Sequence, residues 1–183
     1  MKHMATVALT LNLGVAGVYA QQKPVKMTAS GTLEPSTLNL QPNTNTDEQN
    51  LAGNGTLGPF TFRELHADTG SPQASTTCSG PTKVYFPTVA GAGVFRFQDG
   101  SLLKVNLTQG SDCIDLAAEE AHCTLTFQIT GGTGRFKDAS GILTLTETDL
   151  PVLADAFHNP VFFADTGGFT GTVSGVAGEA TGQ

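Results

Sequence analysis

The sequence predicts an all-β protein, a barrel or a sandwich of about eight short strands, and three observations lead to this prediction. First, charged residues make up only 14% of the 183-residue chain, which contains 22 Gly and no Trp. Second, short runs alternate apolar residues with Thr, as expected for a sheet with one wetted side. Third, convincing helical periodicity is confined to short segments. The length corresponds to one domain, with or without a leader.

The candidate strands follow one another between glycine-containing turns. The clearest is 123–130, in which Cys123, Leu125, Phe127 and Ile129 share one face and polar residues take the other. The complete set of predicted strands is 26–33, 58–67, 82–87, 93–98, 102–108, 123–130, 142–148 and 169–176. Gln-Asp-Gly at 98–100 predicts a hairpin turn. We expect long loops at 34–49 and 68–81, and short helical turns at 115–121, 134–139 and 150–157.

Residues 1–20 have the pattern of a secretory signal peptide. A basic start precedes an apolar run, which ends in Val-Tyr-Ala before two Gln residues. The run is too short to span a membrane. The alternative is that 6–13, which also alternates, forms a half-buried strand. The first interpretation predicts a secreted or periplasmic protein whose single domain comprises residues 21–183.

The charge balance argues against two classes of partner. Nine Lys and Arg stand against 16 Asp and Glu, for a formal net charge of −7. An acidic protein is repelled by phosphate backbones and by anionic lipid surfaces. We therefore expect no nucleic-acid partner and no membrane partner.

The three cysteines predict one disulfide and one free thiol in an exported protein. Cys113 and Cys123 flank an acidic segment between two predicted strands, so a bridge between them would close a short loop. We expect this pair, with Cys78 as the alternative partner of either one, because sequence does not determine connectivity.

A glycine-rich segment, Gly131-Gly132-Thr133-Gly134-Arg135-Phe136, lies between two predicted strands. Its glycines allow a tight change of direction with positive φ, after which Phe136 is expected to return to the core. Arg135 is expected to hydrogen-bond the carbonyls of the turn. The spacing of a phosphate-binding loop and its long following helix are missing, so we do not interpret the segment as a nucleotide site.

This six-residue segment resembles the turn of the allene oxide cyclase and dirigent protein superfamily, and secreted bacterial proteins of unassigned role look similar. The resemblance implies an eight-stranded antiparallel barrel with a central cavity, commonly assembled as a trimer. It implies a fold much more than a function, because the segment is a structural turn. No residues here match the catalytic acids of either family.

The strand at 59–66 carries the most suggestive side chains. Phe60, Phe62, Glu64 and His66 share a face by the period of two. They can form an apolar cavity with acid and base groups at its opening, where a buried Glu64 with a raised pKa would act as a general acid. The simpler interpretation is that Glu64 and His66 mark the point where the strand reaches solvent.

Three further residues are candidates on neighbouring strands. Arg96 can project into the cavity and orient an anionic or carbonyl group, or it can form a salt bridge at the rim with Glu64 or Glu147. Glu147 follows two leucines on the same face and repeats the change from apolar to acidic. Tyr85 is a proton donor, a pocket wall or an ordinary strand residue.

We expect no metal and no cofactor, because the histidines lie far apart and lack zinc-type spacing. The function predicted first is the binding of a small hydrophobic molecule in a secreted barrel, since small closed barrels hold one such ligand. The alternatives are a cyclase-like, isomerase-like or dirigent-like protein acting on a hydrophobic or phenolic substrate, and a purely structural domain. The sequence leaves open whether the protein is an enzyme.

Overall fold

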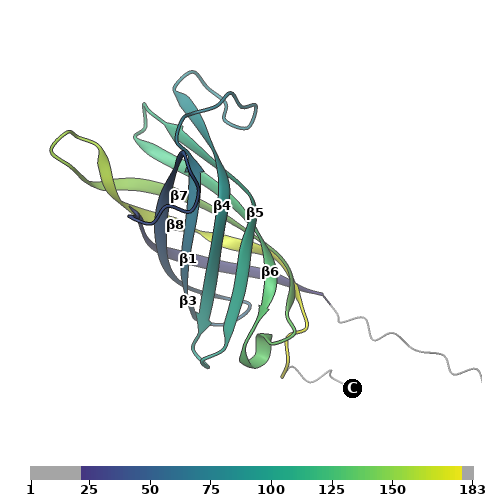
Figure 1. Ribbon diagram of the computed structural model, residues 1–183. Coiled ribbons are helices and arrows are strands. Elements are labelled where there is room, and N and C mark those ends of the chain that lie inside the picture. Colours follow the sequence, from purple (N-terminus) through teal and green to yellow (C-terminus); the bar gives the residue numbers. More distant parts are fainter. Residues whose placement is uncertain (1–21, 179–183) are drawn as a thin grey trace, which may run out of the picture.

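The computed structural model describes residues 22–178, which form one closed antiparallel barrel (Figure 1). Each strand pairs with the next, and β8 pairs with β1 to close the ring. The strands are β1 (Lys23–Pro35), β2 (Thr44–Gly55), β3 (Phe60–Thr69), β4 (Lys83–Phe97), β5 (Leu102–Asp115), β6 (Glu120–Gly132), β7 (Ser140–Ala154) and β8 (Pro160–Ser174). The predicted eight-stranded barrel is confirmed. The predicted signal peptide lies outside the described residues.

Two strand predictions were wrong. The total of eight strands is unchanged, because one strand was missed and another was predicted as two. β2 occupies part of the predicted loop 34–49, whereas 82–87 and 93–98 belong to the single strand β4. β4 is irregular near Val89, because Ala67 pairs with Ala90 while Asp68 pairs with Thr88. β2 shows no apolar alternation because two of the side chains that it turns inward are Asp47 and Gln49.

Only one of the three predicted helical turns exists, a 3-10 turn at Gly134–Phe136. The segments 115–121 and 150–157 are strand ends and hairpin turns. The Asp115 carboxylate accepts hydrogen bonds from the amides of Ala117 and Ala118, which closes the turn between β5 and β6. The Asp155 carboxylate likewise accepts hydrogen bonds from the amides of Phe157 and Asn159, in the turn beyond the end of β7. Within residues 22–178, no helix is long and apolar enough to span a membrane.

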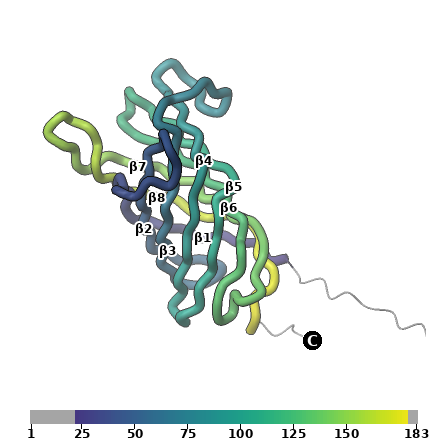
Figure 2. Tube along the Cα trace, viewed as in Figure 1, coloured from purple at the N-terminus to yellow at the C-terminus, as the bar shows by residue number. Residues whose placement is uncertain are grey.

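The two ends of the barrel differ. We call the end with the β1–β2, β3–β4, β5–β6 and β7–β8 loops the mouth, and the opposite end the closed end. Figure 2 shows the β3–β4 loop and the β7–β8 hairpin extending beyond the barrel at the mouth. The chain enters β1 and leaves β8 at the closed end, near the β2–β3, β4–β5 and β6–β7 turns.

The interior toward the closed end is a solid aromatic core. Phe62, Phe95 and Phe169 are fully buried, and their ring centroids lie 4.3 to 5.1 Å apart. Phe127 packs edge-on against Phe62 at 5.9 Å. The Phe62 ring lies so close to Gly93 that a Cβ added there would be 2.5 Å from it. Glycine in this strand therefore makes room for an aromatic ring.

The glycine-rich turn between β6 and β7 has the predicted backbone. Gly131 and Gly134 have φ values of 111° and 58°, in the region that favours glycine. A Cβ on Gly134 would also lie 2.4 Å from the Ser101 hydroxyl. Phe136 is fully buried, as predicted.

Arg135 does not bond the carbonyls of its own turn, contrary to the prediction. Its guanidinium donates to the Leu57 carbonyl and forms an ion pair with Asp99 at 3.1 Å. It also lies over the Phe97 ring, 4.9 Å from the centroid. Arg135 therefore joins the three turns of the closed end.

The disulfide joins Cys78 to Cys113, so the expected Cys113–Cys123 bridge is wrong. Asp112 pairs with Cys123 across β5 and β6, and their side chains point into the barrel. Cys113 is the next residue along β5, so its side chain points outward. There it meets Cys78 in the loop between β3 and β4. Cys123 remains a buried free thiol.

Reduction of this disulfide is expected to lower the free energy of unfolding. The bridge spans a sequence separation of 35 residues, which in the chain-entropy model corresponds to about 2–4 kcal/mol. Cys78→Ser should reproduce most of the loss in a thermal melt. The matched variant Cys123→Ser, which keeps a hydrogen-bond donor, should retain the sensitivity to reductant. Equal melting temperatures with and without reductant would contradict the assignment.

Candidate functional site

Toward the mouth, the interior changes from aromatic to acidic. On β3 the inward positions run Phe60, Phe62, Glu64, His66, Asp68, because alternate residues of a strand face the same way. Strands β2, β5, β7 and β8 also turn acidic side chains inward toward the mouth, whereas β1 and β4 contribute none. We call the resulting ring the acidic belt; its members are Asp47, Gln49, Glu64, His66, Asp68, Asp112, Cys123, Glu147, Asp149 and Asp165.

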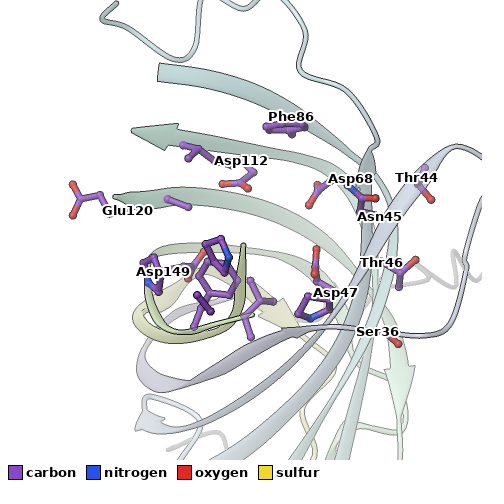
Figure 3. A pocket seen from close by; sticks show the side chains of 18 of the residues that line it. Ser36, Thr44, Asn45, Thr46, Asp47, Asp68, Phe86, Asp112, Glu120 and Asp149 are labelled. Atoms are coloured by element: carbon purple, nitrogen blue, oxygen red, sulfur yellow. The ribbon is translucent and has the colours of Figure 1, made fainter. Parts of the chain in front are cut away.

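A pocket of about 980 Å³ lies above the belt and opens at the mouth (Figure 3). Its floor includes the carboxylates of Asp47, Asp68, Asp112 and Asp149. Its walls are largely apolar and include Leu33, Phe86, Ile114, Pro151 and Phe163. None of the described residues that line it is lysine or arginine. The site therefore combines an apolar wall with an acidic floor.

His66 is held by carboxylates within the belt. Its Nδ1 lies 2.9 Å from Glu64 Oε2, and its Nε2 lies 3.5 Å from Asp68 Oδ2. Burial by itself lowers the pKa of His66, but the charges of Glu64 and Asp68 outweigh that effect and raise the pKa well above its usual range.

Gln49 connects the opposite side of the belt. Its side-chain amide donates to Glu147 Oε1 at 2.7 Å and to Asp165 Oδ2 at 3.3 Å. Burial, together with the neighbouring charge of Asp149, raises the pKa of Glu147 well above its usual range. Burial raises the pKa of Asp149 to about 8 and that of Asp165 to about 6. Glu147 and Asp149 are therefore the residues on this side of the belt that keep a proton at neutral pH.

The Cys123 thiol connects the buried acids to the pocket. It donates to Asp149 Oδ2 at 2.8 Å and approaches Asp112 Oδ1 at 3.1 Å. Burial and these carboxylates raise the pKa of Cys123 well above that of a free thiol, so the sulfur keeps its proton. Burial also raises the pKa of Asp112 to about 6. Asp112 is half-buried and lines the pocket.

Three of the sequence-predicted site residues come together in the belt. Glu64, His66 and Glu147 are buried at 2%, 5% and 4% exposure. The interpretation in which Glu64 and His66 mark a strand reaching solvent is therefore wrong. Phe60 and Phe62 face the same interior, but they belong to the aromatic core and do not line the pocket.

Arg96 and Tyr85 take other places. Arg96 is exposed on the outer face of β4, because it alternates with the buried Phe95 and Phe97. It therefore neither enters the cavity nor reaches Glu64 or Glu147. Tyr85 is half-buried beside the β3–β4 loop, where Gln73 bridges to it, and it does not line the pocket.

Sequence reasoning missed most of the acidic belt. A usable signal existed on β3 and β7, where Asp68 and Asp149 continue the spacing of two after His66 and Glu147. The β2 sequence gave no such signal. Its side chains are polar even where they face the barrel interior, so the sequence resembles that of a loop. The belt neighbours of Asp112 and Asp165 lie on other strands, which come close to them only when the barrel closes.

The comparisons with known proteins assign no family to the chain. No family model matches the chain, and no curated protein matches it. Among solved structures, the chain is similar to a pterocarpan synthase dirigent protein at 11% identity and a TM-score of 0.40. The match covers 91% of this chain and 98% of that one. At this identity the likeness says nothing of activity, and the barrel is established by its strand pairing.

Proposed function

We propose that the barrel binds a small molecule with an apolar body and an uncharged or cationic polar group in the mouth pocket. The observation that carries the proposal is the pocket itself, about 980 Å³ with apolar walls above a floor of carboxylates. Pockets of this size hold one small ligand and use a few polar groups to orient it. A filled interior would favour a purely structural domain, but only the half toward the closed end is filled.

The charge of the floor selects among ligands. The described lining residues include Asp47, Asp68 and Asp112 and no lysine or arginine. An anionic group would lose its hydration and be repelled by these carboxylates, whereas an ammonium or hydroxyl group can donate to them. The earlier expectation that Arg96 orients an anion lacks support, since Arg96 lies outside the barrel.

Three probes with one apolar body test this selectivity: 3-phenylpropylamine, 3-phenylpropan-1-ol and 3-phenylpropanoate, titrated by calorimetry in buffer containing a chelator. We expect the amine to bind at least about tenfold more tightly than the carboxylate, a difference of about 1.4 kcal/mol. Asp112→Asn should reduce this preference, whereas the matched change Glu34→Gln on the outer surface should not. Equal affinity for amine and carboxylate would contradict the proposal. Mass spectrometry of molecules extracted with the protein from its native host then identifies the ligand.

A second candidate function, acid catalysis on a hydrophobic or phenolic substrate, is favoured by the contacts of Asp112. Asp112 reaches the pocket, and Cys123 connects it to the buried, proton-binding Asp149. A cyclase or isomerase needs such a proton donor beside an apolar substrate. Asp112→Asn should then abolish turnover of an identified substrate and leave its binding within a few-fold. Unchanged turnover would remove Asp112 from this role.

We also propose that the protein is exported. The Cys78–Cys113 disulfide supports this, because disulfides persist in oxidising compartments and are rare in the cytosol. Fractionation of the native host, with thiol labelling of the recovered protein, tests it. Recovery of a fully reduced protein from the cytosol would contradict it. The trimer implied by the family resemblance stays a prediction.

A further inference from the structure

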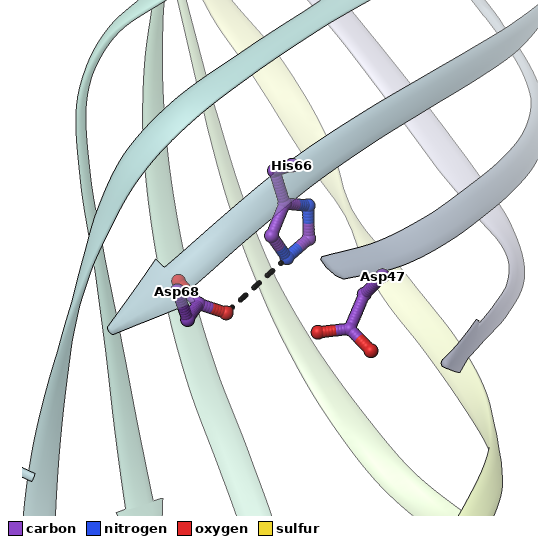
Figure 4. A group of neighbouring side chains, drawn as sticks. All are labelled: Asp47, His66 and Asp68. Carbon is purple, nitrogen blue, oxygen red and sulfur yellow. Dashed lines mark ion pairs between the residues drawn. The ribbon is translucent and has the colours of Figure 1, made fainter. Parts of the chain in front are cut away.

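We propose that Asp47, His66 and Asp68 form a binding site for a zinc-type divalent metal ion on the β2–β3 side of the pocket floor (Figure 4). One donor atom from each residue lies within 4.8 Å of the other two. The pairing of β2 with β3 places Asp47 directly opposite His66, and Asp68 is the next inward residue of β3. Three ligands therefore come from neighbouring positions of two rigid strands.

The histidine is oriented as a metal ligand. Glu64 Oε2 lies 2.9 Å from His66 Nδ1 and fixes the ring, which leaves Nε2 facing Asp68. Histidine ligands commonly hold their second nitrogen to a carboxylate in this way. His66 Nε2 and Asp68 Oδ2 are 3.5 Å apart, longer than a charge-assisted hydrogen bond. Two ligands at zinc distances in a tetrahedral site lie about 3.3 Å apart, which agrees better.

A second observation supports a cation-binding role for Asp68. Asp68 is 7% exposed, and its Oδ1 has no hydrogen-bond partner among the described residues. Buried carboxylate oxygens are normally satisfied by a donor or a metal. In Figure 3, Asp68 and Asp47 both point into the pocket. A metal ion between them would neutralise the Asp68 carboxylate, one oxygen of which has no partner among the described residues.

The ligand set indicates the class of metal. Two carboxylates and one imidazole are ligands of zinc and similar ions, whereas calcium takes six to eight oxygens. Asp47 is only half-buried, so the ion would keep an open position toward the pocket. The second group of candidate ligands, Cys123, Glu147 and Asp149, is less suitable because the thiol already donates to Asp149.

The site goes beyond the proposed function, since an ion there would neutralise part of the acidic floor and would face an uncharged polar group of a bound molecule, such as a hydroxyl, rather than an ammonium group. It also stands without that function, because the ligands belong to the protein alone. The test therefore contains no small molecule: the full chain is treated with a chelator, freed of it, and titrated with ZnCl₂ by calorimetry. CoCl₂ followed by visible absorption reports the coordination. MgCl₂ serves as the comparison ion.

We expect one zinc ion per chain, weaker binding of magnesium, and a higher melting temperature with zinc. Asp68→Asn and Asp47→Asn should each weaken zinc binding at least about tenfold, since each removes an anionic ligand. Glu64→Gln, a change in a positioning residue, should weaken it about 10–100-fold while preserving the Co²⁺ spectrum at saturation. Glu34→Gln, which removes an exposed carboxylate of β1, should leave the affinity unchanged.

Two results would overturn the site: no saturable zinc binding to the folded wild-type chain, or equal affinity in wild type, Asp47→Asn and Asp68→Asn. Circular dichroism of each variant distinguishes loss of zinc binding from loss of folding. The number of zinc ions bound per wild-type chain is measured without any variant, so it tests the site even if a variant fails to fold. Because the phenylpropyl probes are titrated with chelator present and zinc is titrated without probes, either proposal can fail while the other stands.

Discussion

Phe62→Ala is expected to lower the free energy of unfolding by about 3–5 kcal/mol, the usual cost of removing a fully buried aromatic ring. Phe62 is completely inaccessible and contacts Phe95, Phe127 and Phe169. Its ring also fills the space beside Gly93, so the surrounding backbone has little freedom to close the cavity. Urea unfolding followed by circular dichroism measures the change.

The matched change Ile142→Ala, at a side chain 50% exposed on the outer face of β7, should cost about 1 kcal/mol or less.

Phe62→Ala also distinguishes two interpretations of the Phe62 side chain, as part of the core or as part of the ligand site. If Phe62 is core, probe binding in the mouth pocket survives in the folded fraction of the variant. Selective loss of probe binding with little change in stability would return Phe62 to the ligand site.

The second large effect is a fall in stability as pH rises. Burial raises the pKa of Asp149 to about 8 and that of Glu147 well above its usual range, whereas the same groups in the unfolded chain titrate near pH 4. Between these values the folded state binds more protons than the unfolded state, so the free energy of unfolding decreases with increasing pH. The pKa of Asp165, raised to about 6, adds to the effect with the same sign.

We expect a loss of at least about 2 kcal/mol between pH 5 and pH 9, or about 4–8 °C in melting temperature. Thermal melts at constant ionic strength measure it. Glu147→Gln should flatten the profile, because the amide cannot ionise and its oxygen can still accept from Gln49. Glu34→Gln should keep the wild-type profile. A melting temperature that rises from pH 5 to pH 9 would show that these carboxyls are not held protonated.

The aromatic half of the barrel was predictable from sequence, and most of the acidic half was not. The strand at 123–130 and the inward row Phe60, Phe62, Glu64, His66 follow from the period of two. The same rule gave no result on β2, whose inward Asp47 and Gln49 break the apolar pattern by which strands are recognised. As a result, β2 was not predicted. This strand carries Asp47, one of the proposed metal ligands, and Gln49, whose side-chain amide donates to Glu147 and Asp165.

The disulfide and the place of Arg96 show a second limit. Closeness in sequence favoured Cys113 with Cys123, but the two cysteines point to opposite sides of the barrel wall. Arg96 was predicted to lie either in the cavity or at the rim. Because Arg96 alternates with Phe95 and Phe97, whose rings belong to the core, its side chain lies on the outer face of the barrel. In both cases the direction of a side chain depends on which face of the strand becomes the interior.

The sequence by itself determined that this chain forms β-strands, where most of them lie, and how the glycine-rich turn is built, because these depend on local alternation and on φ. Only the tertiary structure decided that ten polar side chains from six strands gather in the mouth half of the barrel interior. Ring closure brings together residues more than 100 positions apart, such as Gln49 and Asp165. The pKa shifts, the pocket and the proposed metal site arise from that proximity and from the burial that accompanies it.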